Sequence, residues 1–423
     1  MEGSLVECAV SLDLMEKMGL CEEFGLKKPK FVEILRKIKE MREKMQGFFR
    51  VQNKMLGIEY VEGEAELLDP KTVEVDGEKL KAENIVIATG SRPKIPNIKG
   101  NDLQGVITYR EVLDLKRLPE KLVIIGGGSI AAAYGYAFRI FGSEVTILEK
   151  HRFLSALDKD LRKYAKSQLE SRGVRVLEGV DVVEISGGSE VNSVLAEVRG
   201  GIEEFPADAV LLAIGLTPNS EIERKMGVKI EKNNEIIVDK RMRTSVEGVY
   251  AVGDVTGPPY LTPVARREGI VAASNIMGRD MEMSYDFVPM SVLMGIELSW
   301  VGTTEEEARK NHEVDVLMNP GGVVCTMGFQ TSKDSFSTIL KILLRLGKAL
   351  SKLLILALSI RSFTLMSCSL RTFMIVFRRN FLNSRPSPNL LLVLSTSIGI
   401  PSSISTSLAM SSSMHLISPS TAV

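Results

Sequence analysis

The stretch KLVIIGGGSIAAAYGYAFRIFGSEVTILEK, residues 121–150, decides the fold of this chain. It opens with the apolar run LVII at residues 122–125, which is typical of a strand buried on both faces. Three glycines follow at once, and a helix of small residues is predicted over residues 129–141. A second apolar strand is predicted over residues 144–148. This order of strand, glycine turn, helix and strand predicts a βαβ unit in a parallel sheet.

The glycine turn carries a fingerprint for binding a dinucleotide. Gly126 and Gly128 allow a tight turn and a close approach of the backbone to a pyrophosphate, and Ala131 allows the helix to pack closely on the strand. The first N–H groups of the helix and its dipole favour phosphate. The residues expected to surround the phosphates are Gly126, Gly127, Gly128, Ser129 and Ile130.

Glu149 follows the second strand, 21 residues after Gly128. A carboxylate at this place can accept hydrogen bonds from a ribose diol, which favours NAD and repels the 2′-phosphate of NADP. Lys150, His151 and Arg152 come directly after it. They could hold that phosphate, or they could form a solvated basic loop. The sequence therefore predicts an NAD(P) site and favours NAD.

The bulk composition bounds the class of protein. The 423 residues include 53 acidic and 53 basic side chains, so nothing suggests nucleic acid as a partner. Four cysteines without a CxxC pair argue against a disulfide-stapled secreted protein. The N-terminus is acidic and only weakly apolar, unlike a signal peptide. We expect two or three domains in a cytoplasmic protein, with no membrane partner and no metal site.

The end of the chain differs from the rest. The 89 residues after Asp334 contain no Asp or Glu, nine Lys or Arg, and long runs of Ser and Leu. Apolar stretches such as residues 342–360 are dotted with basic residues and make poor membrane spans. A basic amphipathic membrane-surface segment is one interpretation. A translated wrong reading frame is the favoured one, because no caps, turns or alternation organise the tail, and no reliable fold is expected beyond about residue 330.

Other segments predict further elements. Residues 30–55 form a helix whose apolar positions, from Phe31 to Phe48, recur in one seam that is expected to pack in the core. Turns at Asp69-Pro70 and Asp76-Gly77 separate short antiparallel strands. The remaining predicted elements are strands at residues 84–88, 174–177, 209–214 and 249–252 and helices at residues 263–277 and 304–310.

Several motifs occur in one order along the chain. They are IVIATGSRP at 85–93, the Gly126 fingerprint, AIGLTPN at 213–219, VYAVGD at 249–254, LTPVA at 261–265 and VGTTEEEA at 301–308. This ordered set over roughly residues 1–320 resembles the class I pyridine nucleotide-disulfide oxidoreductases, of the dihydrolipoamide dehydrogenase type.

The resemblance implies an α/β fold in which a Rossmann-like FAD-binding domain is split by an inserted NAD(P)-binding domain, followed by a partial α+β interface domain of a homodimer. The implied boundaries are an FAD-domain portion at 1–118, the NAD(P) domain at 119–245, an FAD-domain return at 246–283, a partial dimerisation domain at 284–330 and an aberrant or disordered tail at 331–423.

The resemblance also implies the flavin residues. Asp254 would bind hydroxyls of the ribityl chain, which suits a carboxylate at a strand end. The helix that opens near Thr262 would direct its positive end at the flavin. The cofactor residues implied in addition are Gly90, Gly215, Pro263 and Val264.

The chain departs from the family pattern at three places. No second GxGxxG for the ADP half of FAD precedes Ile85, so we expect the chain to enter the fold after that element. The family's redox pair aligns with Gly3 and Cys8, which leaves Cys8 as the one candidate thiol without its partner. The family's Lys–Glu ion pair aligns with Leu12 and Ala133, so both charges are missing together. Ser129 stands where relatives often place a bulky gate, and the family's acid–base His–Glu pair has no counterpart at His415.

Two functions follow from these observations. The first is a flavin-dependent NAD(P)H oxidoreductase, with a disulfide or, because the cysteine pair is incomplete, a quinone, oxygen or one-electron carrier as acceptor. The second is a truncated, inactive product that keeps nucleotide binding. Yellow protein that NADH bleaches supports the first, and colourless protein that binds NADH supports the second.

Overall fold

The computed structural model describes residues 2–25, 27, 29–221, 226–320, 339–345, 373–375 and 392–394. The chain divides into two compact units, one made of Met1–Gly322 and Phe329–Arg345, the other of Val323–Gly328 and Leu346–Val423. In the second unit the described residues are two short antiparallel strands, β20 (Phe373–Ile375) and β21 (Leu392–Leu394). The elements described below all belong to the first unit.

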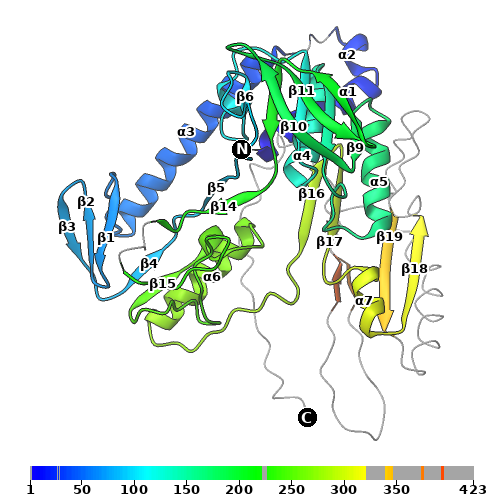
Figure 1. The fold of residues 1–423 in the computed structure, drawn as a ribbon. Coiled ribbons are helices and arrows are strands. Elements are labelled where there is room, and N and C mark those ends of the chain that lie inside the picture. The colour runs from blue at the N-terminus through cyan, green and yellow to red at the C-terminus, as the bar shows by residue number, and fades with distance from the viewer. Residues whose placement is uncertain are drawn as a thin grey trace, which may run out of the picture. The chain divides into compact units, whose positions relative to one another are not determined.

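A five-stranded parallel sheet lies at the centre of the predicted nucleotide region (Figure 1). Its strand order is β6-β13-β7-β8-β9, and all neighbouring strands are parallel. The strands are β6 (Val106–Ile107), β13 (Ala209–Leu212), β7 (Lys121–Ile125), β8 (Glu144–Glu149) and β9 (Arg175–Glu178). Helix α4 (Ser129–Phe141) links β7 to β8, so the predicted βαβ unit is confirmed. Strand β13 lies on the other side of β7, which makes the β7/β13 edge a topological switch point where ligands bind.

Both faces of this sheet are covered, which explains the continuous apolar run in β7. Leu122 and Ile124 face a core shared with α4 and α5 (Lys159–Glu170). Val123 and Ile125 face the antiparallel meander β10 (Val180–Gly187), β11 (Val191–Val198) and β12 (Gly201–Pro206). Alternate residues of one strand therefore belong to two separate cores.

Helix α4 is buried on most of its surface. Its small side chains Ala131, Ala132, Ala133 and Ala137 are almost fully buried. Helix α1 (Glu2–Lys17) and the hairpin β16 (Met290–Met294)–β17 (Ile296–Trp300) both pack on it, opposite the sheet. Small residues suit a helix that has neighbours on several sides.

The segments before and after the sheet region come together in space. Strand β4 (Ile85–Ile87) pairs in parallel with β15 (Val249–Ala251), and β5 (Ser91–Pro93) pairs with β14 (Leu216–Pro218) in an antiparallel ribbon. Helix α6 (Thr262–Ile276) follows β15 and the short helix η3 (Gly253–Thr256). The parallel sheet is thus formed by residues inserted between β5 and β14, and β4 and β15 pair on either side of that insertion in the sequence. This arrangement confirms the predicted α/β fold class.

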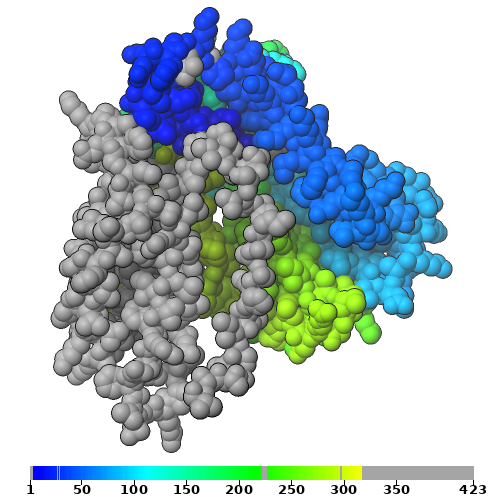
Figure 2. Space-filling model, turned by 180° about the vertical axis from the view of Figure 1, so that it is seen from behind, coloured from blue at the N-terminus to red at the C-terminus, as the bar shows by residue number. Residues whose placement is uncertain are grey.

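The apolar seam of α3 (Phe31–Met55) is only half covered. Phe31, Ile34 and Ile38 are buried, and Phe31 packs on the rings of Phe138 and Phe141. The second half extends toward the meander β1 (Ala65–Asp69), β2 (Thr72–Val75) and β3 (Glu78–Lys81), and it lies on the face shown in Figure 2. There Met41, Met45 and Phe48 are 48%, 53% and 64% exposed. The expected core packing is therefore wrong for the second half of the helix.

The last part of the first unit is a helix and a strand pair. Thr304 and Glu307 form a capping box at α7 (Glu305–Asn311), which confirms the predicted charged helix. Asp158 caps α5 through the N–H of Asp160 and also accepts the N–H of Glu305 at 2.9 Å, so one carboxylate closes two helix ends. Strand β18 (Val314–Pro320) pairs with β19 (Ile339–Arg345), so described strands occur beyond residue 330 at β19, β20 and β21. His415 and most of the tail lie outside the described residues.

The described elements not yet named are α2 (Leu20–Glu23) and η1 (Val112–Asp114). No helix among the described residues is both long and apolar enough to cross a lipid bilayer.

Candidate functional site

The turn after β7 can be made only by a glycine at its first position. Gly126 has φ +108°, and a Cβ placed on it would lie 2.4 Å from the carbonyl oxygen of Ala213. Its N–H donates to the carbonyl oxygen of Leu148 at 2.8 Å. The end of β7 is thus held between the ends of β13 and β8. This places the predicted turn at the switch point of the sheet.

Gly127 and Gly128 have different surroundings. A Cβ on Gly127 would lie 2.8 Å from Oε2 of Glu149, whereas a Cβ on exposed Gly128 would meet no atom of the protein within 4 Å. Gly128 is the N-cap of α4, and no side chain caps this helix end. Ser129 is exposed and Ile130 is half-buried in the first turn. The open space at Gly128 and the uncapped helix end provide room and N–H donors for an anion.

Glu149 lies at the edge of the sheet, half-buried, beside the glycine turn. Its Oε1 accepts the N–H of His151 at 2.7 Å, and in the register of β8 and β9 it stands opposite Glu178. Glu149 therefore remains partly accessible to solvent at this edge. Lys150 pairs with Asp181 at 2.7 Å, and Arg152 approaches Glu306 at 3.8 Å.

A basic cavity of about 390 Å³ lies at the loop that follows Glu149. The loop after β8 and one face of α5 line it, with Glu178 as the acidic residue in the lining. The pKa of Glu178 lies below its usual value: burial opposes this, but the hydrogen bonds from Lys166 and from the N–H of Phe153 outweigh it. The basic lining residues are His151, Arg152, Lys159, Arg162, Lys163 and Lys166.

Gly215 completes the edge on the side of β13. It is exposed, has φ +116°, and a Cβ on it would meet no atom within 4 Å. Its carbonyl oxygen accepts the N–H of Lys94 at 3.0 Å. Gly126, Gly128 and Gly215 thus lie at one edge of the sheet.

A second polar site lies where β4 and β15 end. Parallel strands place their carboxyl ends at one edge, so Gly90 after β4 and Asp254 after β15 come near each other. Ser91 Oγ donates to Oδ2 of Asp254 at 2.7 Å. Gly90 has φ +69° and open space around its Cβ position. The predicted carboxylate therefore lies at a strand edge with one oxygen already oriented.

The first turn of α6 lies against this carboxylate's turn. A Cβ on Gly253 would lie 3.4 Å from Cβ of Ala265. No side chain caps α6, its first residues Thr262 and Pro263 are exposed, and Val264 is buried. The helix thus presents an uncapped positive end beside Asp254, as expected.

The β5–β14 ribbon connects the two sites. Asn219 donates its N–H to the carbonyl oxygen of Gly90 at 2.9 Å and its side-chain amide to that of Thr89 at 2.9 Å. Thr89 Oγ1 donates in return to the carbonyl oxygen of Asn219 at 2.7 Å. Hydrogen bonds between Asn219 and residues 89–90 therefore join the segment after Gly215 to the segment at Gly90.

A family model described as pyridine nucleotide-disulphide oxidoreductase matches residues 6–269, which include both sites. The chain belongs to this family.

Relatives agree with this assignment. The chain is 33% identical over 265 residues to a mercuric reductase of Lysinibacillus sphaericus, covering 62% of this chain and 48% of the relative. It is 36% identical over 266 residues to a dihydrolipoyl dehydrogenase of Thermus scotoductus, covering 60% and 56%. The solved structure of the HOCl-induced flavoprotein disulfide reductase RclA from Escherichia coli matches with a TM-score of 0.70 at 26% identity, covering 86% of each chain. The chain spans about half the length of these two curated relatives.

Cys8 is the candidate redox cysteine of the pyridine nucleotide-disulphide oxidoreductase pattern in this chain. It lies on α1, is exposed, and forms no disulfide. Partial burial of the sulfur, and secondly the charge of Glu7, raise the pKa of the thiol. A raised pKa disfavours the reactive thiolate. Of the other cysteines, Cys21 is also free, and Cys325 and Cys368 lie outside the described residues.

The positions of the family's ion pair are apolar and enclosed. Leu12 on α1 and Ala133 on α4 are both buried, and the two helices pack on each other. An unpaired charge at either place would lack solvent, so the joint loss of both charges fits the packing.

Three residues at these sites were missed by sequence reasoning. Ser91 and Asn219 stood inside quoted motifs. The parallel pairing of β4 with β15 could have signalled the contact of Ser91 with Asp254. Glu268 on α6, which is buried and bonded to the N–H of Gly253, carried no signal in the sequence.

Proposed function

We propose that this chain is a flavin-dependent NAD(P)H oxidoreductase resembling dihydrolipoyl dehydrogenase. The observation that carries the proposal is the pair of strand-edge sites, one at Gly126 and Gly128 and one at Asp254, joined by the β5–β14 ribbon. Each site combines a glycine-bordered turn with an uncapped helix end and one carboxylate. The first site suits the binding of a dinucleotide, and the second suits the binding of a ring system that carries a polyol chain.

The first site fits the coenzyme. The open space at Gly128 accepts the pyrophosphate, the first N–H groups of α4 donate to it, and Glu149 accepts the ribose hydroxyls. Ser129 is small and exposed at the start of α4, so it leaves the approach to the nicotinamide open.

The second site fits part of FAD. Asp254 would hold hydroxyls of the ribityl chain with the oxygen that Ser91 leaves available, and the end of α6 would stabilise negative charge near the ring. When both groups are bound, the nicotinamide and the flavin exchange a hydride. For the ADP half the described residues before β4 offer no glycine-rich turn, since residues 2–17 form α1.

The acceptor follows from Cys8. Its thiol has no partner cysteine among the described residues, and Gly3 stands at the aligned position. A quinone, oxygen or a one-electron carrier therefore fits better than a disulfide substrate. We further propose a cytoplasmic protein that forms a homodimer, as the family resemblance implies.

A second candidate function is nucleotide binding without turnover. It is favoured by α1, because the described residues 2–17 form a helix and offer no glycine-rich turn for the ADP half of FAD. Purified full-length chain distinguishes the two. Flavin absorbance that NADH bleaches supports the oxidoreductase, and a colourless protein that binds NADH and remains unchanged after incubation with FAD contradicts it.

Replacing Asp254 by alanine should weaken FAD binding about tenfold, because hydrogen bonds to a charged group are lost. Ser91→Ala should weaken it less, since Asp254 keeps its charge and loses one orienting donor. Flavin fluorescence titration measures both constants, with exposed Asp102→Ala as the control. Equal FAD affinity for Asp254→Ala and Asp102→Ala would remove Asp254 from the site.

Replacing Glu149 by glutamine should lower the affinity for NADH about tenfold and leave that for NADPH unchanged or higher. The neutral amide accepts weaker bonds from the ribose diol and no longer repels a 2′-phosphate. Glu144→Gln, at the exposed start of the same strand, is the matched control. Titration of coenzyme fluorescence gives the ratio of the two constants, and an unchanged ratio contradicts the role of Glu149.

A further inference from the structure

Glu268 is a buried acid on α6. It is only 2% exposed, and no ion pair found among the described residues includes it. Burying a carboxylate is costly unless donors satisfy both of its oxygens. Its two partners therefore indicate what this residue is for.

Each oxygen of Glu268 has one donor at short distance. Oε2 accepts the N–H of Gly253 at 2.6 Å, and Oε1 accepts the hydroxyl of Tyr285 at 2.6 Å. Gly253 adopts φ +77° and directly precedes Asp254. The bond from Glu268 thus fixes the backbone of a left-handed turn immediately before the carboxylate that faces the proposed flavin.

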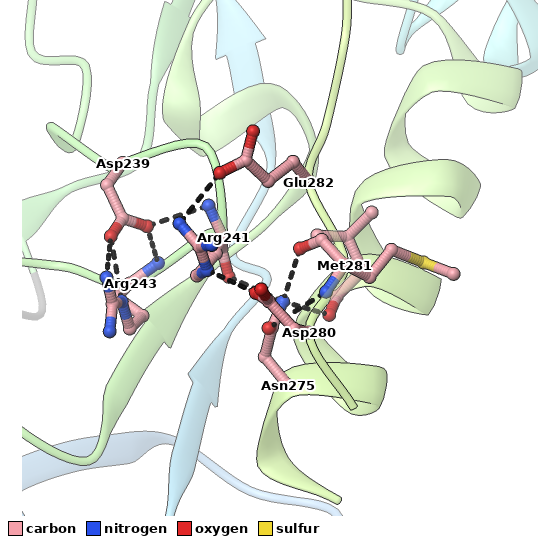
Figure 3. A network of polar contacts seen from close by, with 8 residues as sticks. Asp239, Arg241, Arg243, Asn275, Asp280, Met281 and Glu282 are labelled. Carbon is pink, nitrogen blue, oxygen red and sulfur yellow. Dashed lines mark hydrogen bonds and ion pairs between the residues drawn. The ribbon is translucent and has the colours of Figure 1, made fainter. Parts of the chain in front are cut away.

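The helix that carries Glu268 is itself held at its far end (Figure 3). The side-chain amide of Asn275 donates to the carbonyl oxygens of Val271 and Met281, both at 2.8 Å. Arg241 pairs with Asp280 at 2.7 Å and with Glu282 at 2.8 Å, which fixes the loop that follows α6. A helix anchored in this way gives the Glu268 carboxylate a fixed place.

Resting on the proposed function, we propose that Glu268 is a positioning residue of the flavin site. Its carboxylate orients the Gly253–Asp254 turn, and Tyr285 in turn orients the carboxylate. The Asp254 side chain is then bonded by Ser91, and the backbone of the preceding Gly253 is bonded by Glu268. Burial and the neighbouring Glu268 raise the pKa of Tyr285, so its hydroxyl stays a donor at neutral pH.

The position of Tyr285 extends the contact beyond the flavin region. Residue 285 precedes the hairpin β16–β17, and that hairpin packs on α4, the helix of the coenzyme turn. The Tyr285 hydroxyl therefore links the segment before this hairpin, through Glu268, to the turn that carries Asp254.

The test compares Glu268→Ala, Glu268→Gln and Tyr285→Phe in the full-length chain, with exposed Arg267→Ala on the same helix as control. Flavin fluorescence gives the FAD affinity, flavin absorption reports the surroundings of the ring, and amide hydrogen exchange reports the N–H of Gly253. We expect Glu268→Ala to weaken FAD binding about fivefold and to speed exchange at Gly253 at least tenfold. Glu268→Gln keeps a carbonyl acceptor, so it should recover most of both values, and Tyr285→Phe should lie between.

The outcomes separate this inference from the proposed function. Wild-type affinity and wild-type exchange at Gly253 in Glu268→Ala would overturn the positioning role. Equal losses in Glu268→Ala and Glu268→Gln would also overturn it, because the hydrogen bond would then not be the cause. If the unaltered chain binds no FAD, the proposed function fails, and the exchange rate at Gly253 alone decides whether Glu268 orients the turn.

Discussion

Gly128→Ala should weaken NADH binding about 100-fold while changing the free energy of unfolding by less than about 1 kcal/mol. A Cβ at this position meets no protein atom, and φ is −82°, so the folded chain accepts it. The added methyl group fills the space through which a pyrophosphate must approach the helix end. Titration of NADH fluorescence and urea unfolding measure the two effects.

Gly126→Ala, two residues away, is the matched variant. It should lower the free energy of unfolding, whereas Gly128→Ala should lower the affinity for NADH. Its backbone has φ +108°, and the new methyl group would lie 2.4 Å from the carbonyl oxygen of Ala213. Strain and overlap should cost about 2–4 kcal/mol of folding free energy. If Gly128→Ala instead bound NADH as tightly as the unaltered chain, the glycine turn would not be the phosphate site.

The second large effect is expected at Asp13 on α1. Its Oδ2 accepts the hydroxyl of Tyr136 at 2.9 Å and pairs with Arg172 at 3.2 Å and Lys17 at 3.1 Å. The side chains of Asp13 and Arg172 are each 14% exposed. Asp13→Ala should therefore lower the free energy of unfolding by about 2–3 kcal/mol, because it leaves a mostly buried guanidinium without its partner.

Tyr136→Phe tests the same cluster through pH. Burial, followed by the charge of Asp13, raises the pKa of Tyr136 above its ordinary value of about 10. The native state therefore keeps this proton longer than the unfolded state, and stability present below pH 10 is lost as the pH rises further. Urea unfolding between pH 8 and 11 should show a smaller loss in Tyr136→Phe than in exposed Tyr60→Phe. Identical pH profiles of the two variants would show that Tyr136 does not cause the loss of stability at alkaline pH.

Local sequence predicted the βαβ unit of this fold well. The strand, glycine turn, helix and second strand of residues 121–149 form from contacts between neighbours in the chain, so their order could be read directly. The VYAVGD motif predicted a carboxylate at a strand end, and the structure places Asp254 there.

Tertiary contacts set the limit of prediction. The periodicity of α3 showed which side of the helix is apolar but could not show that its second half has no cover. Glu268 sits among ordinary helix residues, and its bond to Gly253, 15 positions earlier, exists only because the helix turns back on η3. Strand β19 lies in a stretch without acids or turn signals, so its pairing with β18 was not foreseen.

The double cap at Asp158 has a consequence for how the first unit comes apart. One of its oxygens is committed to the start of α5 and the other to the start of α7. When either helix unfolds, Asp158 loses the N–H that it accepts from that helix, so we expect the two helices to unfold together. Helix α7 is therefore expected to unfold at the same temperature as α5, despite its distance along the chain.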